Sequence, residues 1–321
     1  MSKVRNTTID IMKGITILLV ILGHFDSIPD IKHWILSFHM PLFFIIAGYF
    51  HKPQFNYNTF KKDINRLVIP YVFTMGILLV YSFSINILYR YTPDVFLLTL
   101  GGAIFPNGTN FANSVPVWFL LALFWCRQFF NLFHCIKISS YNWIIAASVG
   151  ILCIYTKQAL PFEFPFSITE GVCALPFFVI GYIYNKYDKN VCGAKFWSII
   201  FIILWIAFYR YCSVSMIDAS YNIFPLALVC ACGGTIGVYY LSDMIKRLPY
   251  ISCYLEWAGV NSLVILCVHT IERYVAIPYD RLIEMTNVWV VWGMKIVICS
   301  VFTIICYKFA ITRYVFNLKK T

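Results

Sequence analysis

Apolar stretches long enough to cross a bilayer recur along the whole chain, and they constrain the fold more than any other feature. Each needs about 20 residues in helical form to span the hydrocarbon core. Each must be a helix, because lipid offers no partners for exposed backbone polar groups and no barrel-like alternation is present. The ten stretches lie at about 9–28, 34–51, 67–89, 116–134, 142–159, 168–185, 196–212, 222–241, 253–271 and 287–309. The sequence therefore predicts an all-α, polytopic integral membrane protein with about ten transmembrane helices.

Composition excludes the other fold classes. The chain has 321 residues, of which 60% are hydrophobic and only 12% charged. A soluble domain has about 25% charged residues, and a disordered chain is still more polar. Ten helices with short loops fill the length, so we expect residues 1–321 to form a single membrane-embedded domain.

The basic residues indicate how the helices are oriented. The net charge is +11, which we interpret through the positive-inside rule and not as a nucleic-acid surface, so no nucleic-acid partner is expected. With the N-terminus inside, 17 Lys and Arg residues fall in cytoplasmic segments and six in external ones. This asymmetry predicts that both termini are cytoplasmic, which agrees with an even number of spans.

Charged groups within the first span point to function, because such groups are costly in lipid. Lys13 and His24 are eleven residues apart, about three helical turns, so they share one face with a rise of about 16 Å. An ammonium near the cytoplasm and an imidazole in the outer half suit a long substrate with phosphates at its cytoplasmic end. Asp10, three residues before Lys13, would hold the ammonium in place. The alternative is that Lys13 snorkels to headgroups and His24 caps the helix.

These residues carry a resemblance to a known family. The stretch 9–14 (IDIMKG), running to 20–24 (VILGH), resembles the opening of the acyltransferase family 3 membrane proteins, whose first helix carries a basic residue, ten intervening residues and a His. The second span, 37–49 (SFHMPLFFIIAGY), is similar to the fucose 4-O-acetylase-like branch. Weaker similarities follow in the family's order at 118–123 (WFLLAL), 176–182 (PFFVIGY) and 259–263 (GVNSL), the last ending in His269.

The resemblance implies a ten-helix membrane O-acyltransferase of the bacterial inner membrane. It implies acyl groups, by default acetyl, taken from cytoplasmic acyl-CoA, and acceptor hydroxyls on surface or exported glycans such as capsule, O-antigen, exopolysaccharide or a lipid-linked sugar. Two departures stand out. Lys13 replaces the more usual Arg, and of two Arg residues expected three apart before the third helix only Arg66 is present, with Asp63 at the other position. Lys61 and Lys62 are the nearest substitutes.

Acyl transfer assigns roles to these groups. His24 is the predicted catalytic residue, either as general base on the acceptor hydroxyl or as a nucleophile that forms an acyl-imidazole. Lys13, Lys61, Lys62 and Arg66 are predicted to receive the phosphates of coenzyme A. For the last three, the alternative is a positive-inside cluster that contacts anionic lipid.

Four further residues are predicted to support the site or bind the acceptor. His39 lies at about the depth of His24, and His269 near the outer end of the ninth span; each has a structural hydrogen bond as its alternative. Glu170 would bind sugar hydroxyls or orient a His; the alternative is that it pairs with an external Arg. Trp118 would stack on a sugar; the alternative is that it belongs to the interfacial aromatic belt. Cys230-Ala-Cys232 offers too few ligands for a metal site, and no metal is expected.

Two other functions fit the same composition. In a transporter or flippase of a glycan intermediate, the buried charges would line a translocation path, although the halves show no inverted-repeat pairing. In a structural subunit of an envelope-synthesis complex they would have no chemical role. The expected partners of an acyltransferase are acyl-CoA, the glycan acceptor, membrane lipid and other envelope-synthesis proteins.

Overall fold

The protein is almost entirely helical. The computed structural model describes residues 6–89, 95–105, 116–135, 141–160, 163–187, 194–212, 214–275 and 287–319. Within them, the only sheet is an antiparallel pair of two-residue strands, β1 (Val214–Ser215) and β2 (Ser220–Tyr221). The predicted all-α class is confirmed.

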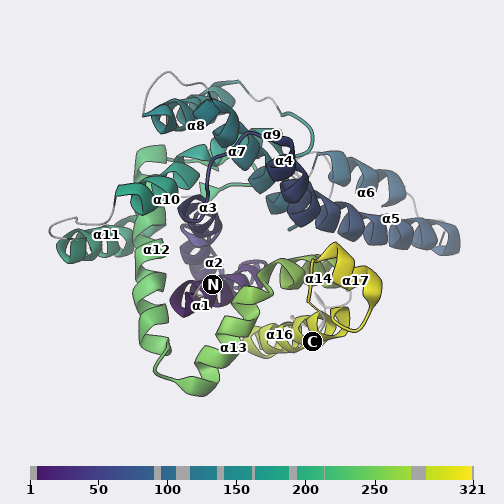
Figure 1. The fold of residues 1–321 in the computed structure, drawn as a ribbon. Coiled ribbons are helices and arrows are strands. Elements are labelled where there is room, and N and C mark those ends of the chain that lie inside the picture. Colours follow the sequence, from purple (N-terminus) through teal and green to yellow (C-terminus); the bar gives the residue numbers. More distant parts are fainter. Residues whose placement is uncertain are drawn as a thin grey trace.

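The helices fall within or across each of the ten predicted stretches. Their bounds are α1 Thr7–Leu22, α2 Pro29–Leu36, α3 His39–Tyr49, α4 Tyr57–Asp63, the π-helix η1 Ile64–Val68, α5 Ile69–Tyr89, α6 Val95–Ile104, α7 Trp118–Cys135, α8 Asn142–Ala159, α9 Ile168–Cys173, α10 Leu175–Tyr187, α11 Ala194–Phe208, the 3₁₀ turn η3 Tyr209–Tyr211, α12 Phe224–Ile245, α13 Pro249–Val260, α14 Ser262–Val275, α16 Val288–Cys306 and α17 Ala310–Val315. Figure 1 shows α13, α14, α16 and α17 grouped together, with α7, α8 and α9 in a second group and α1, α3 and α10 between them.

Several of these helices can cross a membrane. Five helical segments in the described residues are long and apolar enough, and the bent pair α13–α14 makes a sixth when it is taken as one span. The five are Pro29–Tyr49, Tyr57–Leu88, Ile168–Tyr187, Phe224–Ile245 and Val288–Cys306. The membrane character is therefore supported, whereas the number ten, the cytoplasmic termini and the single-domain boundary 1–321 stay predictions.

The predicted span 253–271 is not one straight helix. It consists of α13 and α14, which meet at Asn261 with a bend of 77°. The Asn261 side chain is buried and occupied: its amide donates to the carbonyl of Trp257 at 2.9 Å, and its oxygen accepts from the Tyr307 hydroxyl at 2.6 Å. A break inside an apolar span is tolerated where neighbouring groups satisfy the freed polar atoms, which is the situation here.

At two helix crossings, a glycine on each helix faces the backbone of the other helix and lets the two approach closely. A Cβ atom added to Gly14 would lie 2.0 Å from the carbonyl oxygen of Leu255, and one added to Gly259 would lie 1.7 Å from that of Asp10. The crossing of α3 with α10 repeats this arrangement, because a Cβ atom added to Gly48 or Gly181 would lie 1.9 or 1.8 Å from a backbone oxygen of the opposite helix. Small residues at such crossings let helix backbones approach in a membrane, where helix association relies on packing.

The α1–α13 crossing can be tested by adding single methyl groups. We expect Gly14→Ala and Gly259→Ala to destabilise the protein by about 1–3 kcal/mol, because the new carbon collides with backbone and not with a movable side chain. Gly293→Ala in α16 is the matched control, because nothing lies within 4 Å of its added Cβ. Thermal unfolding in detergent measures the difference, and equal melting temperatures for the three variants would contradict the packing.

Candidate active site

His24 lies just past the end of α1 and stacks on a second histidine. The predicted first span ran to residue 28, but α1 ends at Leu22, and His24 follows the capping residue Gly23. Its ring lies over that of His269 in α14, with centroids 5.3 Å apart and an angle of 19° between the planes. The two predicted residues are 245 positions apart in the sequence, so only the fold brings them together.

His269 is held by a buried chain of charged groups. Its Nδ1 lies 3.2 Å from Oε2 of Glu272, one turn further along α14. The other carboxylate oxygen of Glu272 accepts a hydrogen bond from the ammonium of Lys295 in α16 at 2.8 Å. The Lys295 side chain is only 9% exposed and that of Glu272 only 7%. A carboxylate with two such donors is a compensated buried charge, and it fixes the orientation of the imidazole.

A guanidinium completes the surroundings of His24. Arg273, next to Glu272 in α14, has its NH1 group 3.4 Å from Nδ1 of His24. His39 and Lys32 are near enough to interact electrostatically with the same ring. His39 itself is buried, and its Nδ1 lies 2.9 Å from the carbonyl of Ile35 in the preceding turn. Ile35 belongs to α2 and His39 begins α3, so the structural hydrogen bond to a neighbouring helix considered for His39 is present.

Both stacked rings leave one nitrogen without a partner. The Nε2 atoms of His24 and His269 are closed to solvent, and neither makes a hydrogen bond to any described residue. A buried polar atom without a partner typically costs about 1–3 kcal/mol, and such atoms are rare in folded proteins. Two of them in one stack indicate a place where a ligand's polar atoms can be received.

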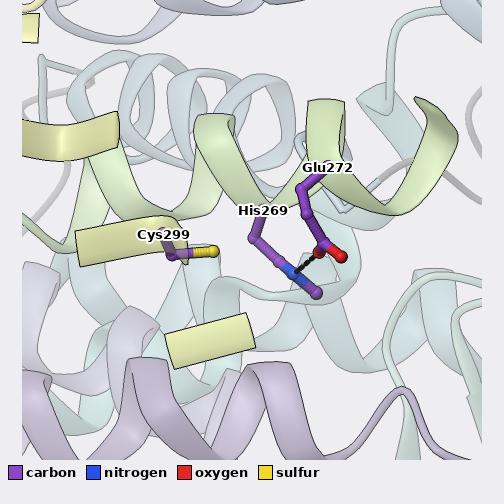
Figure 2. Close-up of side chains that lie close together, drawn as sticks. All are labelled: His269, Glu272 and Cys299. Carbon is purple, nitrogen blue, oxygen red and sulfur yellow. Dashed lines mark hydrogen bonds and ion pairs between the residues drawn. The ribbon is translucent and has the colours of Figure 1, made fainter. Parts of the chain in front are cut away.

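The same cluster includes three potential metal ligands, which Figure 2 shows. Ligand atoms of His269, Glu272 and Cys299 all lie within 4.8 Å of one another. The donor set nevertheless fits a cation poorly, because Lys295 already supplies a positive charge to the carboxylate and His269 bonds to that carboxylate as well. We therefore interpret these side chains as a hydrogen-bonded ion cluster. The absence of a metal cofactor stays a prediction.

Lys13 is held by Asp10, as the spacing predicted. The ammonium lies 3.2 Å from the carboxylate, and the Lys13 side chain is 27% exposed against 6% for Asp10. The first half of α1 packs against α13, through Gly14 and Gly259, while His24 stacks on α14. The two ends of α1 therefore face the two arms of one bent helix pair.

The other predicted phosphate ligands lie on different helices. Lys61, Lys62 and Arg66 are exposed on α4 and η1, which pack against α5 and α7, whereas α1 packs mainly against α13, α12 and α14. Asp63 between them is fully buried. Its Oδ2 accepts a hydrogen bond from Nε of Arg127 at 3.2 Å, and its Oδ1 lies 2.9 Å from NH2 of the same guanidinium in an ion pair. The described contacts do not join this cluster to Lys13.

No described hydrogen bond, ion pair or ring contact joins Glu170 or Trp118 to the stacked histidines, although Trp118 belongs to the same apolar core as Val20 and Val268. Glu170 is 3% exposed and faces Lys157 at 3.7 Å, so its partner is a lysine and not the external arginine considered. Lys157 also lies 3.4 Å from Glu163. The α9 helix that carries Glu170 packs on α7 and α8, and Trp118 at the start of α7 is buried against Phe119.

One comparison with known proteins decides the family. A family model described as an acyltransferase domain matches residues 6–310, nearly the whole chain. The chain belongs to acyltransferase family 3. Comparisons with curated proteins and with solved structures give no match. The family and an acyltransferase activity at a membrane are thereby established, and the fucose 4-O-acetylase-like branch stays a prediction.

In this acyltransferase, the motifs that resemble the family also make the close helix crossings. Gly14 of the first motif meets α13 beside Gly259 of the last, and Gly48 of the second meets α10 beside Gly181 of the fourth. These stretches therefore contain structural as well as chemical residues. The first and last motifs end in the two histidines that stack.

Sequence reasoning missed two members of the acyltransferase cluster, Glu272 and Arg273. The place of Lys295 inside an apolar span favours a buried ion pair over catalysis, and its contact with Glu272 at 2.8 Å confirms that pair. The available signal was helical spacing: Glu272 follows His269 by three residues and therefore shares its face. The partnership with Lys295, on another helix, gives no such signal.

The buried ion pair can be tested by a double-mutant cycle. Glu272→Leu should cost about 3–5 kcal/mol, because the Lys295 ammonium then loses its carboxylate in a dry site. Glu272→Leu/Lys295→Met should recover most of that loss. Asp243→Leu is the control, since Asp243 and Lys246 form an exposed pair at 2.8 Å that is worth at most about 1 kcal/mol. Additive losses in the double variant, measured by thermal unfolding, would contradict the pairing.

Proposed function

We propose that this protein is a membrane O-acetyltransferase that moves an acetyl group from cytoplasmic acetyl-CoA to a hydroxyl of a surface or exported glycan. The acceptor is capsule, O-antigen, exopolysaccharide or a lipid-linked sugar, and the site of action is the bacterial inner membrane. The family match carries the proposal, because it covers residues 6–310 and with them every residue to which we assign a role in the reaction. The stacked histidines supply the reactive groups.

The chemistry needs a group that handles a proton, stabilisation of the tetrahedral oxyanion, and exclusion of water. His24 and His269 present two unpartnered nitrogens in one dry stack, which suits the first two tasks. The surrounding apolar helices keep water from the reacting thioester. His24 is the residue that we place against the thioester.

The donor enters from the end of α1 that carries Lys13. With a cytoplasmic N-terminus, Lys13 lies toward the cytoplasm and His24 toward the opposite face, as the extended form of acetyl-CoA requires. Asp10 holds the ammonium but leaves it partly exposed, so it can still meet a phosphate. Lys61, Lys62 and Arg66 are exposed cations that we propose attract the remaining phosphates at the same membrane face.

The acceptor approaches from the other face. His39 interacts electrostatically with His24, although less strongly than the stacked His269 does, and we place it beside the acceptor. Glu170 and Trp118 lie on α9 and α7 and make no described polar or ring contact with the stack, so we place them against another part of the glycan. Partner proteins of envelope synthesis would deliver or remove the glycan.

Replacement of His24 tests the catalytic assignment. We expect His24→Ala to lower acetyl transfer at least about 100-fold, which is typical when a group that acts in the transition state is lost, while acetyl-CoA still binds. The assay measures labelled acetyl passing from acetyl-CoA to envelope glycan from a strain that lacks the gene. His33→Ala is the matched control, because His33 bonds to the Tyr209 carbonyl at 3.0 Å, outside the stack.

The same assay separates the competing functions. Full transfer by a folded His24→Ala variant would overturn the catalytic assignment. Glycan movement across vesicles that persists without any acyl donor would favour a flippase. Loss of one acetyl mass per sugar from the surface glycans of cells without the gene would fix donor and acceptor class together.

Replacement of Lys13 tests the donor site. We expect Lys13→Met to raise the KM for acetyl-CoA about tenfold or more, because a hydrogen bond to a charged group contributes about 1.5–3 kcal/mol. Lys13→Arg should keep most of the affinity, since its charge and donors remain. Lys195→Met, an exposed lysine on α11, is the control. A KM unchanged in Lys13→Met would exclude Lys13 from phosphate binding.

A further inference from the structure

The two stacked histidines are not equivalent, because their neighbours fix different tautomers. Arginine has only donors, so the Nδ1 of His24 that faces Arg273 must accept. A neutral His24 then carries its proton on Nε2, and that unpartnered nitrogen is a donor. Carboxylates only accept when ionised, so the Nδ1 of His269 that faces Glu272 must donate. A neutral His269 therefore has its lone pair on Nε2.

The charge of Glu272 supports this assignment. Its second oxygen accepts from the Lys295 ammonium at 2.8 Å, which favours the ionised carboxylate. A carboxylate behind Nδ1 of an imidazole holds the tautomer in which Nε2 can take a proton, as in the hydrolytic triads. The structure thus places one free donor and one free acceptor in adjacent rings, both shielded from water.

We propose that His269, oriented by Glu272 and Lys295, is the proton acceptor of the reaction, and that His24 is the hydrogen-bond donor to the thioester carbonyl. This inference rests on the proposed function and divides its chemistry between two residues. Neither the general-base role nor the acyl-imidazole role considered for His24 is then needed. Glu272 and Lys295 are positioning residues, because they act through His269.

The steps balance as follows. The acceptor hydroxyl gives its proton to Nε2 of His269 while its oxygen bonds to the thioester carbon. The carbonyl oxygen becomes an oxyanion, and it is stabilised by the Nε2–H group of His24. The carbon–sulfur bond then breaks, its electron pair leaves with the coenzyme A sulfur, and the proton on His269 passes to that thiolate. The products are the acetyl ester and coenzyme A, and both histidines return to their starting tautomers.

Hydroxylamine distinguishes the two roles, because it attacks a thioester without a base. The assay gives purified full-length protein acetyl-CoA with either envelope glycan or hydroxylamine, and measures ester or acetohydroxamate. We expect His269→Gln to lose glycan transfer about 10²–10⁴-fold yet retain most hydroxamate formation. His24→Ala should lose both reactions about 10²–10³-fold, and His24→Gln should regain part of both, because a glutamine amide can still donate.

A second pair of variants covers the case in which His269→Gln does not fold. Glu272→Gln/Lys295→Met removes both charges together, so neither is left facing a lost partner. We expect it to lower kcat for the glycan at least about tenfold, with the KM for acetyl-CoA unchanged and hydroxamate formation kept. A purely structural role would lower both reactions equally.

The outcomes are distinct. Wild-type protein that forms neither ester nor hydroxamate from acetyl-CoA would defeat the proposed function itself. If the wild-type protein is active, but His24→Ala keeps hydroxamate formation while His269→Gln loses it, the division of roles is overturned and the base is His24. Unchanged glycan transfer in Glu272→Gln/Lys295→Met would overturn the positioning role.

Discussion

The lack of hydrogen-bond partners in hydrocarbon governs this structure. It forces the backbone into helices and requires each polar side chain placed inside to meet another protein group. Asn261 meets this requirement at the break between α13 and α14, where Tyr307 and the Trp257 carbonyl occupy its side chain. Glu272 meets it between His269 and Lys295. Among the buried polar atoms without partners in the described residues, the Nε2 atoms of His24 and His269 belong to one ring stack, which suits them to receive a ligand.

Close helix packing brings His24 and His269 together in one site. The glycine crossing of α1 with α13 fixes the first half of α1, and the bend at Asn261 then directs α14 toward the other end, where His24 lies. A straight span would carry His269 in a different direction. The bend is thus the structural reason that an N-terminal and a C-terminal histidine share one stack.

The residues of the family motifs have their contacts in different parts of the fold. In the first motif, Lys13 is paired with Asp10 on α1 itself, beside the crossing of Gly14 with α13, whereas His24 follows the end of α1 and stacks on α14. The exposed cations on α4 and η1 belong to another part of the fold, where Asp63 is bound by Arg127. The replacement of a basic residue by Asp63 therefore has a structural counterpart in a neighbouring helix.

The sequence by itself determined the helical class, the membrane character and the family, and it singled out Lys13, His24 and His269 as candidate site residues. These follow from apolar length, from the cost of charge in lipid and from local motifs, which are all properties of short segments. Only the tertiary structure decided that His24 meets His269, that Arg273 faces one ring and Glu272 the other, and that Lys295 completes the chain of charges. Contacts between helices depend on crossing points and bends, such as those at Gly14 and Asn261, and no spacing along one segment encodes them.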